Sequence, residues 1–238
     1  MMRFSLDDSR AAGVSVVIPC FNAQAYVGEA INSVLEQLRP GDEVIVVDDG
    51  STDDSMAVIA SFAQRVHAVR QKNQGISGAR NTGLMHCTRE TIAFLDADDL
   101  WPEGSLELRR RTLAKNRSLG FVWGAVEAFI SPELDAEARG AIGVMPPTRG
   151  GRLAGSMLVK RRVFEHVGGF DRTFHVGETM DWVARADAAG VVSEEIDAVL
   201  VRRRLHGANT MAKQQRMQND YLRVLRMSIE RKRAQHPA

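Results

Sequence analysis

The sequence predicts an α/β protein built on an open, mostly parallel β-sheet that is flanked by helices. Two observations indicate this class. Short, continuously apolar segments alternate with helical patterns over the first hundred residues, and polar or turn-forming clusters follow the apolar segments. A strand, a helix and a second strand in this rhythm form a right-handed crossover, which makes the two strands parallel.

The first half of the chain is expected to supply four strands and three helices. Val14–Ile18 is rich in β-branched residues and is expected to stop at Pro19, which has no N–H for a central ladder. Ala25–Leu38 carries apolar residues at helical spacing, and Ser51–Asp54 has the Ser-x-x-acid form that caps a following helix. The other expected elements are the strands Glu43–Asp48, Val66–Arg70 and Thr91–Asp96 and the helix Ala79–Met85.

Beyond residue 100 the alternation becomes less regular. Residues 131–152 mix Pro, Gly and charged residues without a sustained period, so we expect a long loop there. The elements expected in this half are the helix Pro102–Lys115, the strands Phe121–Ile130 and Leu153–Val159, the helices Arg161–Val167 and Asp181–Ala189, a strand within Ser193–Leu205, and a helical tail over Lys213–Arg233.

The composition limits the classes of function. Lys and Arg number 31 against 30 Asp and Glu, and a net charge of +1 argues against a nucleic-acid partner. No stretch approaches the roughly 20 apolar residues of a transmembrane segment, and the N-terminus lacks the apolar core of a signal peptide. We therefore expect a cytoplasmic protein. The basic tail from Arg202 onward suits either a solvated helix face or contact with the inner face of the membrane.

Polar clusters follow three of the expected strands, at Pro19–Asn22, Asp48–Ser51 and Asp96–Asp99. Ligands of open α/β sheets bind outside the carboxyl ends of the strands, so these clusters are expected to meet in one crevice. The carboxylates gathered there repel one another unless a cation or hydrogen-bond donors compensate them. A Mg²⁺ or Mn²⁺ ion that carries a diphosphate meets this need, and the Asp-x-Asp motif at Asp96 and Asp98 is the expected metal-binding motif.

Each of these acidic residues also has a purely structural explanation. Asp98 and Asp99 can cap the helix that is expected from Pro102, and Asp48 can form a turn with Gly50. Asp49 can form the same turn, or its carboxylate can accept hydrogen bonds from a nucleobase or ribose, as acidic residues do in dinucleotide sites.

A series of motifs in a fixed order resembles family 2 glycosyltransferases of the GT-A fold. The series consists of Val-Val-Ile-Pro-Cys-Phe-Asn at 16–22, Val-Val-Asp-Asp-Gly-Ser-Thr-Asp at 46–53, Asn-Gln-Gly at 73–75, Ala-Arg-Asn at 79–81 and Phe-Leu-Asp-Ala-Asp-Asp at 94–99. The likeness continues to His206 and Asn209 and spans roughly residues 13–210.

The resemblance implies an enzyme that moves a sugar from a nucleotide-diphospho-sugar, with a UDP-sugar favoured, to an acceptor nucleophile with inversion and metal assistance. It implies one GT-A domain over residues 1–210, with a nucleotide-binding half at 13–100, an acceptor and catalytic half at 101–210, and a helical tail at 211–238. The acceptor can be a saccharide, a lipid carrier, a small molecule or a peptide.

The resemblance also assigns site residues by position. Asp49 would contact the base, Arg80 the ribose or phosphate, and Asp96 the sugar and ribose. The full set implied for nucleotide-sugar binding is Pro19, Phe21, Asn22, Asp49, Asn73, Gly75, Arg80, Asp96 and Ala97. Asp98 and His206 would hold Mg²⁺ or Mn²⁺, although His206 is otherwise explained as a solvated residue after three arginines.

The chain departs from the family at the residue that removes the acceptor's proton. Relatives commonly use the Asp of a Glu-Asp pair at the start of a late helix, and this pair reads Glu178-Thr179 here. A threonine is no general base, so Glu178 is the first candidate and Asp181, about one helical turn further on, is the second. Both could instead complement the helix dipole, which leaves open an acceptor such as a thiol that ionises readily.

Two other functions remain in competition at this point. A sugar nucleotidyltransferase would need a basic, Gly-rich phosphate loop, and residues 19–23 contain no Lys, Arg or Gly. A catalytically degenerate scaffold or binding subunit is suggested by Thr179, whereas the intact Asp96 and Asp98 argue against it. Trp101 follows the acidic cluster directly and is the best candidate to stack on a sugar ring.

Overall fold

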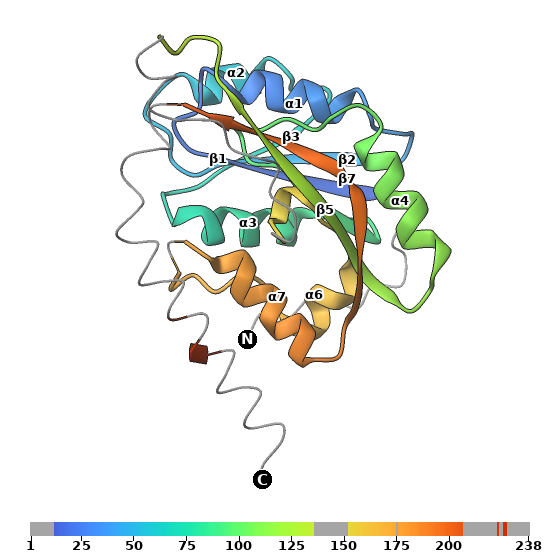
Figure 1. Ribbon diagram of the computed structural model, residues 1–238. Helices are drawn as coiled ribbons and strands as arrows, with labels where there is room; N and C mark the ends of the chain where they lie inside the picture. The colour runs from blue at the N-terminus through green and yellow to red at the C-terminus, as the bar shows by residue number, and fades with distance from the viewer. Residues whose placement is uncertain (1–11, 136–151, 175, 207–222, 224–225, 228–238) are drawn as a thin grey trace.

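The computed structural model describes residues 12–135, 152–174, 176–206, 223 and 226–227 (Figure 1). Its elements follow in the order β1 (Val14–Cys20), α1 (Val27–Leu35), β2 (Glu43–Asp48), α2 (Ser55–Ala60), β3 (His67–Arg70), α3 (Gly75–His86), β4 (Thr91–Phe94), α4 (Ser105–Lys115), β5 (Leu119–Ile130), the 3-10 turn η1 (Ala154–Ser156), β6 (Leu158–Lys160), α6 (Arg161–Val167), α7 (Glu178–Ala188) and β7 (Val192–Leu205).

The described strands form one seven-stranded sheet in the order β3-β2-β1-β4-β6-β5-β7. The β1–β2, β2–β3, β1–β4 and β5–β7 pairs are parallel, whereas β6 runs antiparallel to β4 and β5. Cys20 pairs with Asp48, so β1 and β2 end side by side. The expectation of an open, mostly parallel sheet with flanking helices is confirmed.

Alternating residues of the central strands pack on opposite faces of the sheet, which explains their continuous apolar sequences. On one face Val16 and Ile18 pack with residues of α1, α2 and α4; on the other, Val17 and Ile45 pack with residues of α3, α6 and α7. Figure 1 shows α1 and α2 on one side of the sheet and α3, α6 and α7 on the other. The carboxyl ends of the central strands are therefore left uncovered between the two helical layers.

Several element boundaries differ from those the sequence predicts. β1 does not stop at Pro19 but continues to Cys20, with Pro19 opposite Val47. The last pair of the β1–β4 ladder is Val17 with Phe94, so Pro19 lies beyond it and its missing N–H costs no ladder hydrogen bond to β4. α4 begins at Ser105 rather than at Pro102, directly after Gly104 at φ +73°.

The strand expected at Leu153–Val159 is mostly wrong. Its first part is η1, in which the Ser156 and Met157 N–H groups donate to the Leu153 and Ala154 carbonyls, and only β6 pairs as a strand of the sheet. The expected loop at 131–152 and helical tail at 213–233 lie largely outside the described residues. Within the described part of the chain, no helix is long and apolar enough to span a membrane.

Candidate active site

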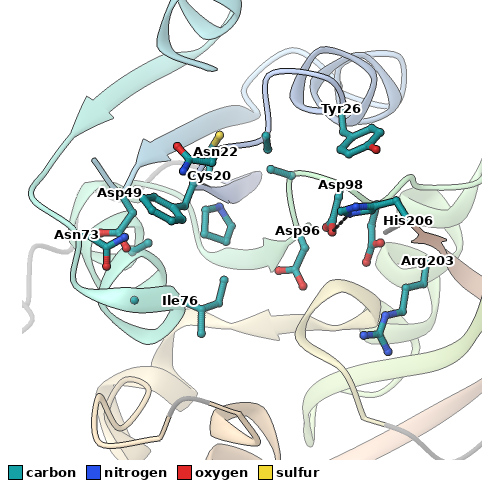
Figure 2. A pocket seen from close by; sticks show the side chains of 17 residues that line it. Cys20, Asn22, Tyr26, Asp49, Asn73, Ile76, Asp96, Asp98, Arg203 and His206 are labelled. Carbon is teal, nitrogen blue, oxygen red and sulfur yellow. Dashed lines mark hydrogen bonds and ion pairs between the residues drawn. The ribbon is translucent and has the colours of Figure 1, made fainter. Parts of the chain in front are cut away.

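A pocket of about 710 Å³ opens at the carboxyl ends of β1, β2 and β4 (Figure 2). It is lined by Pro19, Cys20, Phe21, Asn22, Ala23, Tyr26, Asp49, Asn73, Gly75, Ile76, Ala79, Asp96, Ala97, Asp98, Asp99, Arg203 and His206. The three polar strand ends therefore meet in one crevice, as the sequence predicts. In Figure 2, Asp49 and Asn73 lie at one end and His206 and Arg203 at the other, with Asp96 between them.

The carboxylate of Asp49 is oriented by neutral donors from nearby segments. Its Oδ1 accepts a 2.6 Å hydrogen bond from Gln71 Nε2 and a 2.9 Å bond from the Gln74 N–H. The Thr82 hydroxyl donates to Gln71 Oε1 at 2.5 Å and so fixes the direction in which that amide points. The structure gives Asp49 Oδ2 no hydrogen-bond partner among the described residues, so a ligand N–H could bind it.

The turn after β1 is tied to the turn after β2. Asn22 lies at φ +49°, the left-handed region that Asn tolerates better than most residues. Its N–H donates to Ser51 Oγ at 2.9 Å, and its Oδ1 accepts from the Thr52 N–H at 2.8 Å. Phe21, held on this turn, has half of its side chain exposed beside the pocket, where a flat base could stack on the ring.

The acidic loop after β4 presents its carboxylates in different states. Asp96 and Asp98 have 40% and 30% of their side chains exposed, whereas Asp99 is buried. Burial, followed by repulsion from Asp98 and then Asp96, raises the pKa of Asp99 well above its ordinary value. The Arg204 N–H donates to Asp99 Oδ1 at 3.0 Å, so Asp99 ties the loop to β7 rather than capping a helix.

His206 follows β7 and lies against this loop. Its Nε2 is 3.1 Å from Asp98 Oδ2, and its ring centroid is 4.6 Å from that of Tyr26. His206 is buried, so the explanation that it is a solvated residue is wrong. A carboxylate and an imidazole this close can together bind one divalent ion, and the carboxylate is the ligand type that Mg²⁺ and Mn²⁺ prefer. No group of three or more His, Cys, Asp or Glu residues able to hold a metal occurs within the described ranges.

Arg204 holds the acidic loop and β7 together. Its side chain is buried, its Nε donates to the Asp98 carbonyl at 3.1 Å, its Nη1 donates to Ser131 Oγ at 3.2 Å, and Nη2 pairs with Glu29 of α1. The expectation that the basic residues from Arg202 onward form a solvated face is therefore wrong at Arg204, which is buried. Its guanidinium positions the backbone from which Asp98 projects.

Arg80 lies behind the pocket rather than lining it. Its Nη2 binds Asp96 Oδ1 at 2.6 Å, its Nη1 pairs with Glu178 Oε1, and its guanidinium lies 5.5 Å from the ring centroid of Phe170. Burial alone would lower the pKa of Arg80, but Asp96 and Glu178 raise it above its ordinary value. Arg80 thus contacts the pocket through Asp96, and its guanidinium is already committed to two carboxylates.

Neither carboxylate predicted as the base lines the pocket. Glu178 Oε1 is held by Arg80 and accepts from the Thr179 hydroxyl at 3.1 Å, and 11% of the Glu178 side chain is exposed. Asp181 is fully buried and accepts from Arg185 Nε at 2.8 Å. Arg185 also donates to the carbonyl oxygens of residues 167 and 169, so Asp181 orients the arginine that joins α7 to the end of α6 and the loop after it.

The structure brings most of the predicted binding residues together: Pro19, Phe21, Asn22, Asp49, Asn73, Gly75, Asp96, Ala97, Asp98 and His206 all line the pocket.

Trp101, the residue expected to stack on a sugar ring, does not line the pocket. This side chain is buried, donates to the Gly155 carbonyl at 3.1 Å and stacks 4.0 Å from the Arg109 guanidinium. The lining residues Tyr26 and Arg203 were missed. Successive side chains of a strand point to opposite faces, so a known register of β7 would have placed Arg203 on one face and Arg202 and Arg204 on the other.

Comparison with known proteins identifies the family. The model of the family described as "Glycosyl transferase family 2" matches residues 15–167. Chondroitin synthase of Escherichia coli is 28% identical over 228 residues, which cover 92% of this chain and 33% of that protein. The E. coli enzyme WfgD, named UDP-Glc:alpha-D-GlcNAc-diphosphoundecaprenol beta-1,3-glucosyltransferase, is 34% identical over 116 residues, covering 48% of this chain and 46% of that one. The chain thus spans less than half the length of these curated relatives.

Solved structures share the fold. S. aureus TarS in complex with UDP-GlcNAc superposes with a TM-score of 0.72 at 17% identity, over 92% of this chain and 66% of that one. The mannosyltransferase PcManGT of Pyrobaculum calidifontis, in complex with GDP-Man and Mn²⁺, gives 0.69 at 22% identity, over 93% and 67%. The sheet and helices described above are therefore a GT-A fold. With the family match over residues 15–167, this shows that the chain belongs to glycosyl transferase family 2.

Proposed function

We propose that this chain transfers a sugar from a nucleoside-diphosphate sugar, a UDP-sugar in the first instance, to an acceptor with inversion and with the assistance of Mg²⁺ or Mn²⁺. The observation that carries the proposal is the pairing of Asp98 with His206, 3.1 Å apart, at the opposite end of the pocket from Asp49. A pocket with a base-binding carboxylate at one end and metal-type ligands at the other suits a nucleoside diphosphate. The printed names of WfgD, TarS and PcManGT, which mention UDP-Glc, UDP-GlcNAc and GDP-Man, support this donor class.

The nucleoside is assigned to the Asp49 end. Asp49 Oδ2 would accept an N–H of the base, and the exposed ring of Phe21 would stack on it. Uracil and guanine both present such an N–H. The remaining nucleotide-sugar contacts are assigned to Pro19, Asn22, Asn73, Gly75, Asp96 and Ala97, all in the pocket, with Arg80 acting through Asp96.

The divalent ion is assigned to Asp98 and His206. The two ligands fit an ion that keeps its other positions for water and phosphate oxygens, as Mg²⁺ and Mn²⁺ do with nucleotides. The presence of Mn²⁺ in the PcManGT complex supports this assignment. When bound, the ion would supply Lewis-acid stabilisation of the diphosphate.

Proton acceptance is assigned to Glu178. Glu178 does not line the pocket but is linked to it through Arg80 and Asp96. Its Oε1 is held by Arg80 and Thr179, while Oε2 takes no hydrogen bond from the described residues and would receive the acceptor's proton. In the reaction the acceptor oxygen bonds to the anomeric carbon, the bond from that carbon to the β-phosphate oxygen breaks, and the acceptor's proton passes to Glu178. Asp181 is the second candidate, although its ion pair with Arg185 favours a structural role. The acceptor class, the domain division and a cytoplasmic location stay predictions.

A panel of UDP-Glc, UDP-GlcNAc and GDP-Man with Mn²⁺ tests the donor class by nucleotide release and by transfer to saccharide, lipid-carrier and peptide acceptors. We expect one donor to be consumed and its nucleotide diphosphate to accumulate. Absence of both binding and turnover with every donor would contradict the proposal. Binding without transfer to any acceptor would instead favour the non-catalytic binding subunit that Thr179 suggests.

Separate Glu178→Gln and Asp181→Asn variants test the base. Glu178→Gln is expected to lower kcat roughly 10²- to 10⁴-fold while UDP affinity stays near that of the parent. Asp181→Asn is expected to lower thermal stability and to leave most of kcat intact. Full turnover in both variants would remove the assignment of the base.

A further inference from the structure

Arg203 is the one arginine or lysine among the described residues that line the pocket. It belongs to the last strand, its side chain is exposed, and it lies at the same end as His206 and Asp98 (Figure 2). The structure gives its guanidinium no hydrogen bond or ion pair within the described part of the chain. Its positive charge lies at the end of the pocket opposite Asp49, where burial and the neighbouring carboxylates raise the pKa of Asp99 and the Arg203 charge opposes them more weakly.

The neighbouring arginines of β7 are already engaged elsewhere. Arg202 pairs with Glu127 at 3.8 Å and lies 4.8 Å from the Phe129 ring centroid, and Arg204 is buried against Glu29 and Ser131. Because successive side chains of a strand point to opposite faces, Arg203 alone of the three is turned toward the pocket. Arg202 is consequently a matched control, one residue away on the same strand.

The charge balance of the pocket indicates that Arg203 compensates a bound anion. Asp49 and Asp98 line it together with Asp96, which Arg80 compensates in part, and a nucleoside diphosphate would bring further negative charge beside them. Such an anion enters only where positive groups compensate it. A guanidinium presents a fork of N–H donors that matches phosphate oxygens, which makes arginine a specific phosphate ligand.

We propose that Arg203 is a catalytic residue that donates hydrogen bonds to the β-phosphate of the nucleoside-diphosphate donor. The inference rests on the proposed function and adds a contact from the chain itself, separate from the metal ligands. When the bond between the anomeric carbon and the β-phosphate oxygen breaks, the electron pair stays on that oxygen. Arg203 would stabilise the charge that develops there.

Calorimetric titration in EDTA isolates this contact, because no divalent ion then contributes to phosphate binding. UDP, UMP and uridine are titrated into the parent, Arg203→Gln, Arg203→Lys and Arg202→Gln proteins. Arg203→Gln is expected to weaken UDP binding about tenfold and to leave UMP and uridine binding unchanged, since only UDP carries the β-phosphate. Arg203→Lys should recover part of the loss, and Arg202→Gln should match the parent. If the parent binds GDP instead of UDP, then GDP, GMP and guanosine take their places.

Parent-like UDP binding by Arg203→Gln would overturn the inference and leave the proposed function standing. An equal loss for UMP and UDP would place the contact on the α-phosphate and also overturn it. A changed preference between UDP-glucuronate and UDP-glucose with unchanged UDP affinity would show that Arg203 contacts the sugar, which is a third contradicting result. If the parent protein binds neither UDP nor GDP, the proposed function fails and the inference fails with it.

Discussion

The two ends of the pocket are built by different physical means. At one end Asp49 is held by the Gln71 amide and the Gln74 backbone N–H, both neutral and both within 25 positions in the sequence. At the other end Asp98 faces His206, 108 positions away, and the loop that carries it is fixed by Arg204.

This difference has consequences for binding. Neutral hydrogen bonds between nearby segments respond little to salt and depend on the first half of the fold alone. Charged contacts between distant segments respond to salt and depend on the docking of β7 against the rest of the sheet. The nucleoside end should therefore select the base, and the far end should handle the phosphates and the reacting bond.

The largest expected effect comes from removing the proposed metal ligand. Asp98→Asn should lower Mn²⁺-dependent turnover roughly 10³-fold, because several kcal/mol of leaving-group stabilisation would be lost. Uridine affinity should not change, since Asp49 is untouched. Steady-state kinetics and uridine titration provide the two readouts. Asp187→Asn, which alters a carboxylate paired with Arg152 outside the pocket, is the control. Turnover above a tenth of the parent value would contradict the role of Asp98.

Removing the Arg204 contacts that join β7 to the acidic loop should mainly lower the free energy of unfolding. Arg204→Met removes buried hydrogen bonds to the Asp98 carbonyl and Ser131, and the free energy of unfolding should fall by about 2–3 kcal/mol. Arg202→Met removes a half-exposed pair with Glu127 and should cost about 0.5 kcal/mol or less. Urea denaturation measures both variants. Equal losses would show that Arg204 is not the tie between β7 and the acidic loop.

The nucleoside end can be weakened without touching any charge. Gln71→Met removes the donor to Asp49 Oδ1 and should weaken uridine binding about tenfold, because the carboxylate is no longer oriented. Thr82→Val, which only releases the Gln71 amide, should cost about two- to threefold. Gln74→Ala keeps the backbone N–H and serves as the control. Unchanged uridine affinity in Gln71→Met would place the base elsewhere.

The smallest expected effect is a difference in how salt changes the affinities for UDP and for uridine. Raising NaCl from about 0.05 M to about 0.5 M should weaken UDP binding a few-fold by screening its phosphates from Arg203 and other charges. Uridine binding should change little over the same range. Calorimetry at both salt concentrations is sufficient. A larger salt effect on uridine than on UDP would reverse the comparison.

The same contrast explains which features the sequence predicts. β2 at Glu43–Asp48 and α6 at Arg161–Val167 occur at the predicted residues, because local apolar patterns define both. The polar strand ends likewise meet where a parallel sheet must bring them. The first part of the strand expected at Leu153–Val159 is instead the turn η1, whose Gly155 carbonyl accepts hydrogen bonds from side chains far away in the sequence, Trp101 and Arg109.

Ion pairs determine where the residues expected near the reacting groups lie. Arg80, Glu178 and Asp181 do not line the pocket: Arg80 pairs with Asp96 and with Glu178 on another segment, and Asp181 pairs with Arg185 one turn further along α7. The direction of Arg203 depends on the β5–β7 register, which shifts between Gly124 and Val126. Counting residues along β7 does not reveal such shifts, so neither the exposure of Arg203 nor the burial of Arg204 could be predicted.

The coupling between Mn²⁺ and nucleotide binding shows whether the Asp98 end of the pocket holds a metal-bound diphosphate. UDP and uridine, or GDP and guanosine if the protein prefers them, are titrated calorimetrically into the parent protein with Mn²⁺ and with EDTA. We expect Mn²⁺ to strengthen diphosphate binding at least about tenfold and to leave nucleoside binding unchanged. Equal diphosphate affinity with and without Mn²⁺, or no affinity for either diphosphate, would contradict it.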